Sequence, residues 1–183
     1  ESLEKKEEFP KTSQPTPMAF MEAYKKVIDN GDEAVVIVLS AKLSGTYQSA
    51  KLASEGLEDK IFIVDSLNVS NAEGALVEYA LRLVDEGKSA REIANILEDA
   101  KKKLRLVVLV DTLEYLERGG RISKASALLG GIFSVKVLLS MEDGAIESVG
   151  KAKGIKNANN LFISEIKKHG SIDFSMPLKL GYT

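Results

Sequence analysis

The sequence predicts an α/β protein of two domains, with a parallel sheet in the first domain and a smaller α/β unit in the second. Three short apolar runs rich in Val and Leu or Ile, at 34–39, 61–64 and 106–110, are typical of buried strands. Segments with helical periodicity separate them, as in α/β folds. The later part of the chain instead contains a hairpin followed by a helix. We therefore expect domains at residues 1–104 and 105–183.

The first elements have clear boundaries in the sequence. Thr16 can cap a helix whose first residue is Pro17, and Asn30-Gly31 ends that helix. The strand 34–39 follows. Ser44 or Thr46 is the expected N-cap of the next helix, which runs to about residue 55.

The strand 61–64 ends at Asp65-Ser66, and a long helix then continues to Gly87. Ser89 and Glu92 have the spacing of a capping box, which predicts the start of another helix.

The expected second domain opens with the buried strand 106–110. The turn Glu142-Asp143-Gly144 joins two predicted strands as a hairpin. Helices are expected at 113–117, from Ser123 through 129, and at 156–168.

Composition narrows the class of protein. The net charge of the 183 residues is −2, which argues against a nucleic-acid partner. No apolar run approaches the ~18 residues of a membrane span, so a soluble protein is expected. Cysteine is absent, which excludes thiolate chemistry and fits a reducing cytoplasm. We expect no metal site and no cofactor.

The two ends of the sequence predict a piece of a longer protein. Residue 1 is Glu rather than Met, and residues 178–183 have the pattern of a strand that is just beginning.

The stretch 43–50, Leu-Ser-Gly-Thr-Tyr-Gln-Ser-Ala, is the most informative motif. A strand end, a turn containing Gly45 and a helix start make a general anion site, because helix N–H groups face the ligand there. Ligands of open α/β sheets bind beyond the carboxyl ends of the strands. Thr12, Ser13 and Ser44 could add hydroxyl groups to hold a carboxylate or phosphate. Local turn bonds and helix capping explain the same three residues without a ligand.

Basic residues supply two further candidates. Arg121 follows Gly119-Gly120 and could present a guanidinium to an anion, or it could be a surface residue at a helix end. Lys151, Lys153 and Lys156 are either a solvated surface or a docking patch for an acidic partner.

Signatures of catalysis are mostly missing. Ser44 lacks a G-x-S-x-G motif, and His169, the single histidine, lies at a predicted helix end. Asp65, Asp111 and Asp143 occupy turn positions, where Asp commonly bonds to the backbone.

Four motifs in this order resemble the DegV family of bacterial fatty-acid-binding proteins. They are T-S-Q-P-T at 12–16, L-S-G-T-Y-Q-S-A at 43–50, D-T-L-E-Y-L-E-R-G-G-R-I-S at 111–123, and G-K-A-K-G at 150–154.

The resemblance implies a two-domain α/β protein that holds one long-chain fatty acid between its domains. Thr12 and Ser44 match the residues that grip the carboxylate, with Ser13 and Gly45 beside them, and Arg121 matches an arginine near the head group. Some members present the fatty acid to a separate kinase, so the protein would be a non-catalytic carrier. Burial of a C16 chain, at ~0.8 kcal/mol per methylene, would contribute roughly 12 kcal/mol.

Two departures from the family pattern stand out. Lys153 replaces an arginine associated with the kinase-facing surface. The family's N-terminal strand and its C-terminal motif containing a histidine have no counterpart here, and His169 does not match that histidine.

Leu128-Leu129 and Ile132-Phe133 are candidates for the wall of the acyl tunnel.

Two rival functions remain open. One is a hydrolase or phosphotransferase that uses Ser44 as nucleophile on a small anionic substrate. The other is a sensor or structural module in which the lipid only stabilises the core.

Overall fold

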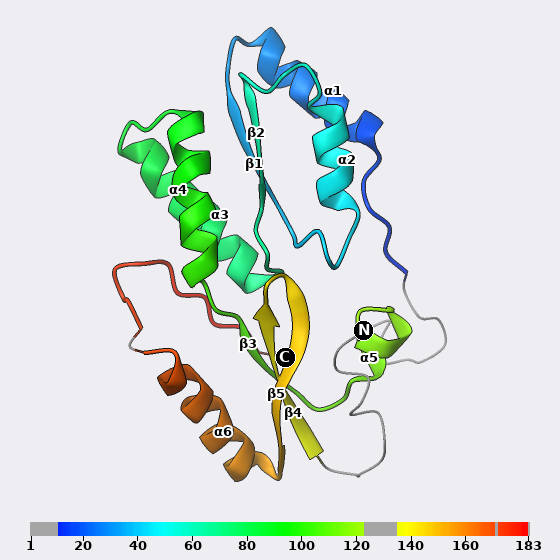
Figure 1. Ribbon diagram of the computed structural model, residues 1–183, viewed down its shortest axis with the longest axis vertical. Helices are drawn as coiled ribbons and strands as arrows, with labels where there is room; N and C mark the ends of the chain where they lie inside the picture. Colours follow the sequence, from blue (N-terminus) through cyan, green and yellow to red (C-terminus); the bar gives the residue numbers. More distant parts are fainter. Residues whose placement is uncertain (1–10, 123–134, 171, 183) are drawn as a thin grey trace.

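The computed structural model describes residues 11–122, 135–170 and 172–182. The molecule is elongated (Figure 1), with a two-stranded sheet in one half and a three-stranded sheet in the other. The two-domain α/β architecture expected from the sequence is therefore confirmed. We propose the division near residue 104, because α4 (Ala90–Lys103) ends there and β3 (Val107–Val110) begins the second sheet.

The first half has three layers. Strands β1 (Ala34–Val38) and β2 (Ile61–Asp65) pair in parallel. Helices α3 (Asn71–Asp85) and α4 cover one face, and α1 (Pro17–Asp29) and α2 (Thr46–Ala53) cover the other (Figure 1). Since both faces are covered, the strands can be apolar throughout.

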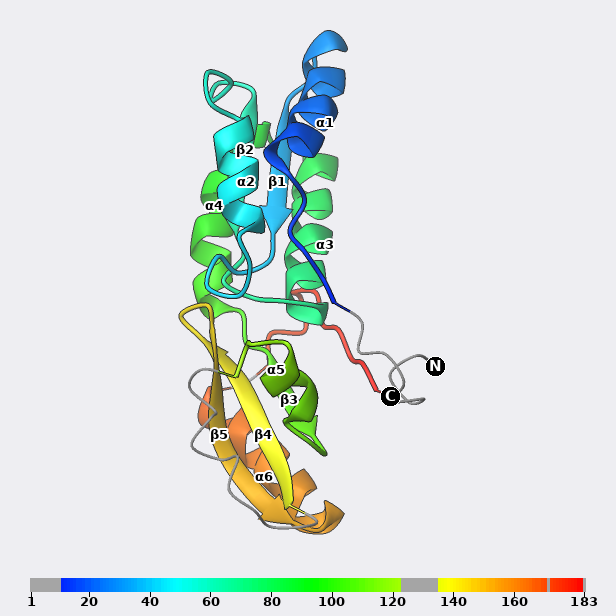
Figure 2. The same cartoon turned by 90° about the vertical axis from the view of Figure 1, so that its right-hand side faces the viewer.

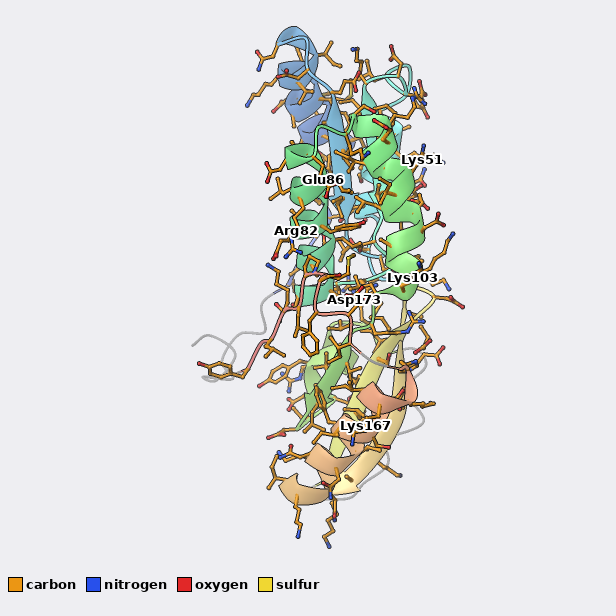
Figure 3. All side chains as sticks on the ribbon, turned by 90° about the vertical axis from the view of Figure 1, so that its left-hand side faces the viewer. Lys51, Arg82, Glu86, Lys103, Lys167 and Asp173 are labelled. Carbon is orange, nitrogen blue, oxygen red and sulfur yellow. The ribbon has the colours of Figure 1, made fainter. Side chains whose placement is uncertain are left out.

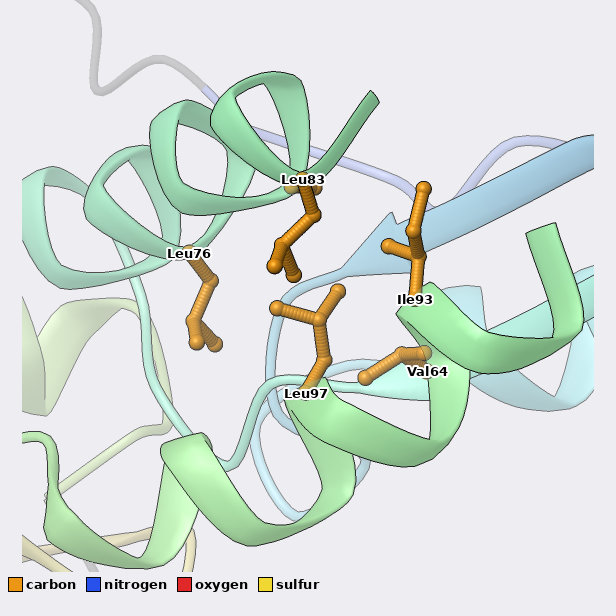
Figure 4. Close-up of a cluster of buried hydrophobic side chains, with 6 residues drawn as sticks. Val64, Leu76, Leu83, Ile93 and Leu97 are labelled. Carbon is orange, nitrogen blue, oxygen red and sulfur yellow. The ribbon is translucent and has the colours of Figure 1, made fainter. Parts of the chain in front are cut away.

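Each helical layer packs through its own apolar cluster. Between α3, α4 and the sheet the buried side chains are Val64, Leu76, Ala80, Leu83, Ile93 and Leu97 (Figure 4). On the opposite face the cluster contains Tyr24, Ala53 and Ile61. The hydroxyl of Tyr24 donates to the carbonyl of Ala50 at 3.2 Å, and burial raises the pKa of Tyr24 to about 12. These contacts fix α2, the helix that follows the L-S-G-T motif.

The helix starts follow the sequence prediction at two places and differ at a third. Thr16 accepts from the amide of Ala19 at 3.3 Å, and the Ser89–Glu92 capping box is complete. The predicted N-cap of α2 is wrong, because Gly45 occupies that position. The Ser44 hydroxyl accepts from the amide of Thr46 at 3.3 Å, so it closes a local turn just before the helix.

The second half is built on the antiparallel sheet β3–β4–β5, with β4 (Val135–Glu142) in the centre and β5 (Ala145–Lys153) beside it. Helix α6 (Ile155–Lys168) covers one face, and the short α5 (Glu114–Arg118) lies on the other (Figure 2). Asp143 and Gly144 form the two-residue turn between β4 and β5, with φ values of 48° and 81°. Positive φ at both positions matches the right-handed twist of a hairpin.

Two strand predictions need correction. The run 106–110 forms β3 but is not fully buried, because β3 lies at the edge of its sheet and Val108 is 37% exposed. The strand expected at 178–183 is not formed by the residues that the structure describes there.

Residues 172–182 instead cross the lower end of α3 (Figure 3). Arg82 of α3 donates to the carbonyl of Ser175 at 2.8 Å, and Lys179 pairs with Glu78 at 2.6 Å. Polar contacts with a helix replace the strand pairing that a sheet requires.

The predicted helix that starts at Ser123, and the tunnel-wall candidates Leu128-Leu129 and Ile132-Phe133, lie outside the described residues. Within the described part of the chain, no helix is both long and apolar enough to span a bilayer.

Candidate functional site

The candidate site lies where the loops after β1 and β2 meet the second half of the molecule. The loop 39–45 leaves the carboxyl end of β1 and leads into α2. The loop 66–70 leaves β2 and leads into α3. Parallel pairing brings these loops to one edge of the sheet.

Backbone and side-chain hydrogen bonds join the two loops and order the loop after β2. The amide of Ser40 donates to the carbonyl of Asn68 at 2.8 Å. The Ser66 hydroxyl donates to the same carbonyl at 3.1 Å, and Ser40 and Ser66 are fully buried. The Asp65 carboxylate accepts from the amides of Ala41 and Leu67 at 3.3 and 2.9 Å. Asp65 thus bonds to the backbone, as its turn position predicts.

Ser44 lies directly before α2. Its hydroxyl is 2.8 Å from the hydroxyl of Thr46, which is buried. The first N–H groups of a helix have no acceptor within the helix, and the dipole adds a positive field at this end. A hydroxyl pair next to such a helix start can hold the oxygens of an anion.

Three other parts of the chain contact the Ser44 loop. Arg121 donates from Nε to the carbonyl of Leu43 at 3.1 Å, which places its guanidinium one residue from Ser44. The Ser40 hydroxyl donates to the carbonyl of Gly144 at 2.6 Å, so the tip of the β4–β5 hairpin lies against the loop. Gln14 donates to the hydroxyl of Ser49 at 3.2 Å, which brings the T-S-Q-P segment to the first turns of α2.

The structure therefore gathers Ser44, Gly45, Arg121 and the segment containing Thr12 and Ser13 around one loop. Both Thr12 and Ser13 are exposed, two and one residues from the Gln14 contact. Ser40, Gln14 and Gly144 also build this region and were not among the predicted site residues. Gln14 belongs to the T-S-Q-P-T motif, but its contact with α2 joins residues 35 positions apart, which spacing alone does not reveal.

Lys153 lies away from this loop. It ends the nine-residue strand β5, whose other end begins next to the Gly144 tip. At about 3.3 Å per residue, roughly 26 Å separate the two ends. Lys153 pairs across the sheet with Val135 and is exposed.

Two ionisable groups bear on the chemistry available. Burial raises the pKa of Glu73, in the first turn of α3, above its ordinary value. His169 is the C-cap of α6, and its Nε2 lies 2.9 Å from the carboxylate of Glu165. Across the described ranges, no group of three or more His, Cys, Asp and Glu side chains could hold a metal ion.

Comparison with known proteins identifies the family. The sequence model of the DegV family, described as a family of uncharacterised proteins, matches residues 1–180. The chain belongs to the DegV family. A DegV domain-containing protein of Caldanaerobacter subterraneus is 36% identical over 181 residues, covering 93% of this chain and 64% of that protein. One from Lactococcus lactis is 39% identical over 160 residues, covering 84% of this chain and 55% of the relative. The chain thus spans about 60% of the length of these DegV relatives.

Solved DegV structures share the fold. A fatty-acid-binding DegV protein of Thermus thermophilus superposes with a TM-score of 0.84 at 34% identity, covering 92% of this chain and 60% of the other. A Streptococcus pneumoniae fatty acid kinase (Fak) B3 protein loaded with linoleic acid has a TM-score of 0.80 at 25% identity, covering 92% and 61%. Both proteins share the fold described above over 92% of this chain.

Proposed function

We propose that the protein binds a long-chain fatty acid between its two domains, with the carboxylate at the Ser44 loop. The observation that carries this proposal is the structural likeness to the Thermus thermophilus fatty-acid-binding protein, with a TM-score of 0.84 over 92% of the chain. The geometry supports it, because Ser44 joins a helix start to a loop that contacts both halves of the molecule.

In this proposal polar groups orient the ligand and the acyl chain supplies most of the affinity. The hydroxyls of Ser44 and Thr12 hold the carboxylate, with Ser13 and Gly45 alongside. Arg121 stabilises the loop through Leu43 and adds positive charge near the head group. The apolar chain gains ~0.8 kcal/mol per buried methylene, roughly 12 kcal/mol for a C16 chain, which exceeds the ~1.5–3 kcal/mol of each hydrogen bond to the carboxylate.

The experiment is a titration of the purified protein with palmitate and oleate, followed by native mass spectrometry. We expect one fatty acid per chain. Ser44→Ala should weaken binding by about 10- to 150-fold, since hydrogen bonds to charged groups contribute ~1.5–3 kcal/mol. Ser54→Ala is the matched control, because Ser54 lies at the opposite end of α2 and its hydroxyl donates to Lys51. Equal affinity in wild type and Ser44→Ala would remove Ser44 from the head-group site, and a protein that binds neither fatty acid would overturn the function.

We further propose that the protein is a cytoplasmic carrier that presents its fatty acid to a kinase, and that Lys153 contacts this partner. Its exposure and its distance from the Ser44 loop suit a docking residue better than a ligand contact. Lys153→Glu should leave palmitate affinity unchanged and slow acyl phosphate formation by a fatty acid kinase with ATP. Lys51→Glu, an exposed change on α2, is the control. Unchanged phosphorylation of Lys153→Glu would exclude the docking role.

A serine-dependent enzyme receives less support from the same geometry. Among the described residues, the Ser44 hydroxyl bonds to the hydroxyl and the amide of Thr46, and neither is a base. The hydrogen-bond partner of His169 is Glu165 within α6. The non-catalytic carrier therefore remains our proposal.

A further inference from the structure

Gln14 joins two segments that the proposed function uses together. Its Nε2 donates to the hydroxyl of Ser49 at 3.2 Å. Ser49 is only 3% exposed, so this hydroxyl is a fixed point within α2. Thr12, two residues before Gln14, and Ser44, five residues before Ser49, therefore lie on segments joined by one side chain.

The same side chain lies against the glycine of the L-S-G-T motif. A Cβ placed on Gly45 would lie 1.9 Å from Oε1 of Gln14 and 2.5 Å from its Cδ. Gly45 has a φ of −72°, which any residue adopts, so its backbone conformation does not require glycine. A side chain at position 45 would instead push the Gln14 amide away from its place beside Ser49.

Neighbouring contacts explain why this spacing matters. Pro15 and Pro17 stiffen the chain after Gln14, and Thr16 anchors it as the N-cap of α1. On its other side, the Ser44 loop is held through Leu43 by Arg121 and through Ser40 by Gly144. Gln14 is thus the link from the T-S-Q-P segment to a loop that the second half already holds.

From these contacts we infer that Gln14 is a positioning residue, which sets the separation of the Thr12 and Ser44 hydroxyls and keeps its place only while position 45 carries no side chain. This inference rests on the proposed function, because the two hydroxyls are taken to grip one carboxylate. Gln14 itself does not need to touch the ligand. A carboxylate held from two segments loses one partner when their separation changes.

A double-mutant cycle tests the contact. The dissociation constant for palmitate is measured for wild type, Gln14→Ala, Gly45→Ala and the double variant. We expect each single change to weaken binding about tenfold and the double change to weaken it no further, because both break the same contact. Fully additive losses would overturn the link between Gln14 and Gly45.

A second cycle separates positioning from general stability. Thr12→Ala should weaken binding in the wild-type background by about tenfold but by less than threefold when Gln14 is already Ala, since the hydroxyl is then no longer placed. Gln48→Ala is the matched control, because Gln48 is an exposed glutamine in α2, next to the Ser49 that Gln14 contacts. Thermal unfolding of each variant checks that the fold is retained. A purely structural role would lower stability without changing the loss on Thr12→Ala.

The outcomes distinguish this inference from the proposed function. Wild-type protein that binds palmitate, together with a Gln14→Ala variant of equal affinity, overturns the positioning role alone. Wild-type protein that binds neither palmitate nor oleate overturns both.

Discussion

The β1–β2 sheet is covered by two helices on each face and packed by an apolar cluster on both sides. The β3–β4–β5 sheet is antiparallel, and one edge strand remains half-exposed. The difference follows from the connections, because parallel strands need helical crossovers whereas antiparallel ones need only a short turn. Crossovers bring loops to one sheet edge, where the candidate site forms. The hairpin supplies a tight tip, Gly144, which contacts those loops through Ser40.

The largest expected effect comes from testing whether the two halves unfold separately. Leu97 in α4 and Leu138 in β4 are both fully buried. Truncation of either to Ala should cost about 2–5 kcal/mol. The contacts between the halves described above, such as Ser40 with Gly144 and Arg121 with Leu43, are local polar ones. We therefore expect two transitions in urea, with Leu97→Ala lowering one midpoint and Leu138→Ala the other. Leu52→Ala, at a half-exposed position of α2, should change stability by no more than about 0.5 kcal/mol. A single transition shifted by both changes would show that the halves unfold as one unit.

A smaller effect is expected where the halves meet. Gly144 has a φ of 81°, and an added Cβ would lie 2.6 Å from the Ser40 hydroxyl. Gly144→Ala should cost about 2–4 kcal/mol, from backbone strain and from the displaced contact. Gly87→Ala is the control, with a φ of 79° and no atom within 4 Å of the added Cβ. It should cost only about 1–2 kcal/mol of backbone strain. Equal losses of unfolding free energy in urea would mean that the hairpin tip does not support the loop.

The smallest effect concerns a local feature of the first half, the Ser89–Glu92 capping box. Ser89→Ala should destabilise the protein by about 1 kcal/mol. Hydrogen bonds from Ser89 lower the pKa of Glu92 below 4.5 in the folded state. A lowered folded-state pKa stabilises the protein above pH 4.5, and this contribution disappears as the pH falls through the lower value. Urea midpoints of wild type and Glu92→Gln should therefore converge on acidification. A difference that stays constant between pH 7 and pH 3 would contradict this explanation.

The sequence predicted most elements of the fold because their signals are local. The Thr16 cap with Pro17, the Ser89–Glu92 box and the Asp143-Gly144 turn each lie within a few residues of the structure that they determine. The errors arose where a distant neighbour decides. Burial of 106–110 depends on the place of β3 in its sheet, and the strand predicted at 178–183 depends on a partner strand.

The candidate site likewise has features that nearby residues determine and features that distant neighbours determine. By itself, the sequence determined the family through its motifs and placed Ser44 and Gly45 between a strand and a helix, because strand and helix periodicity are properties of neighbouring residues. Only the tertiary structure decided what holds this loop: Gln14 over Gly45, Arg121 on Leu43 and Gly144 on Ser40. These contacts join residues 31, 78 and 104 positions apart, and their geometry depends on how the folded layers pack. No local pattern encodes these contacts, because they form only when the second half and the T-S-Q-P segment lie against the folded Ser44 loop.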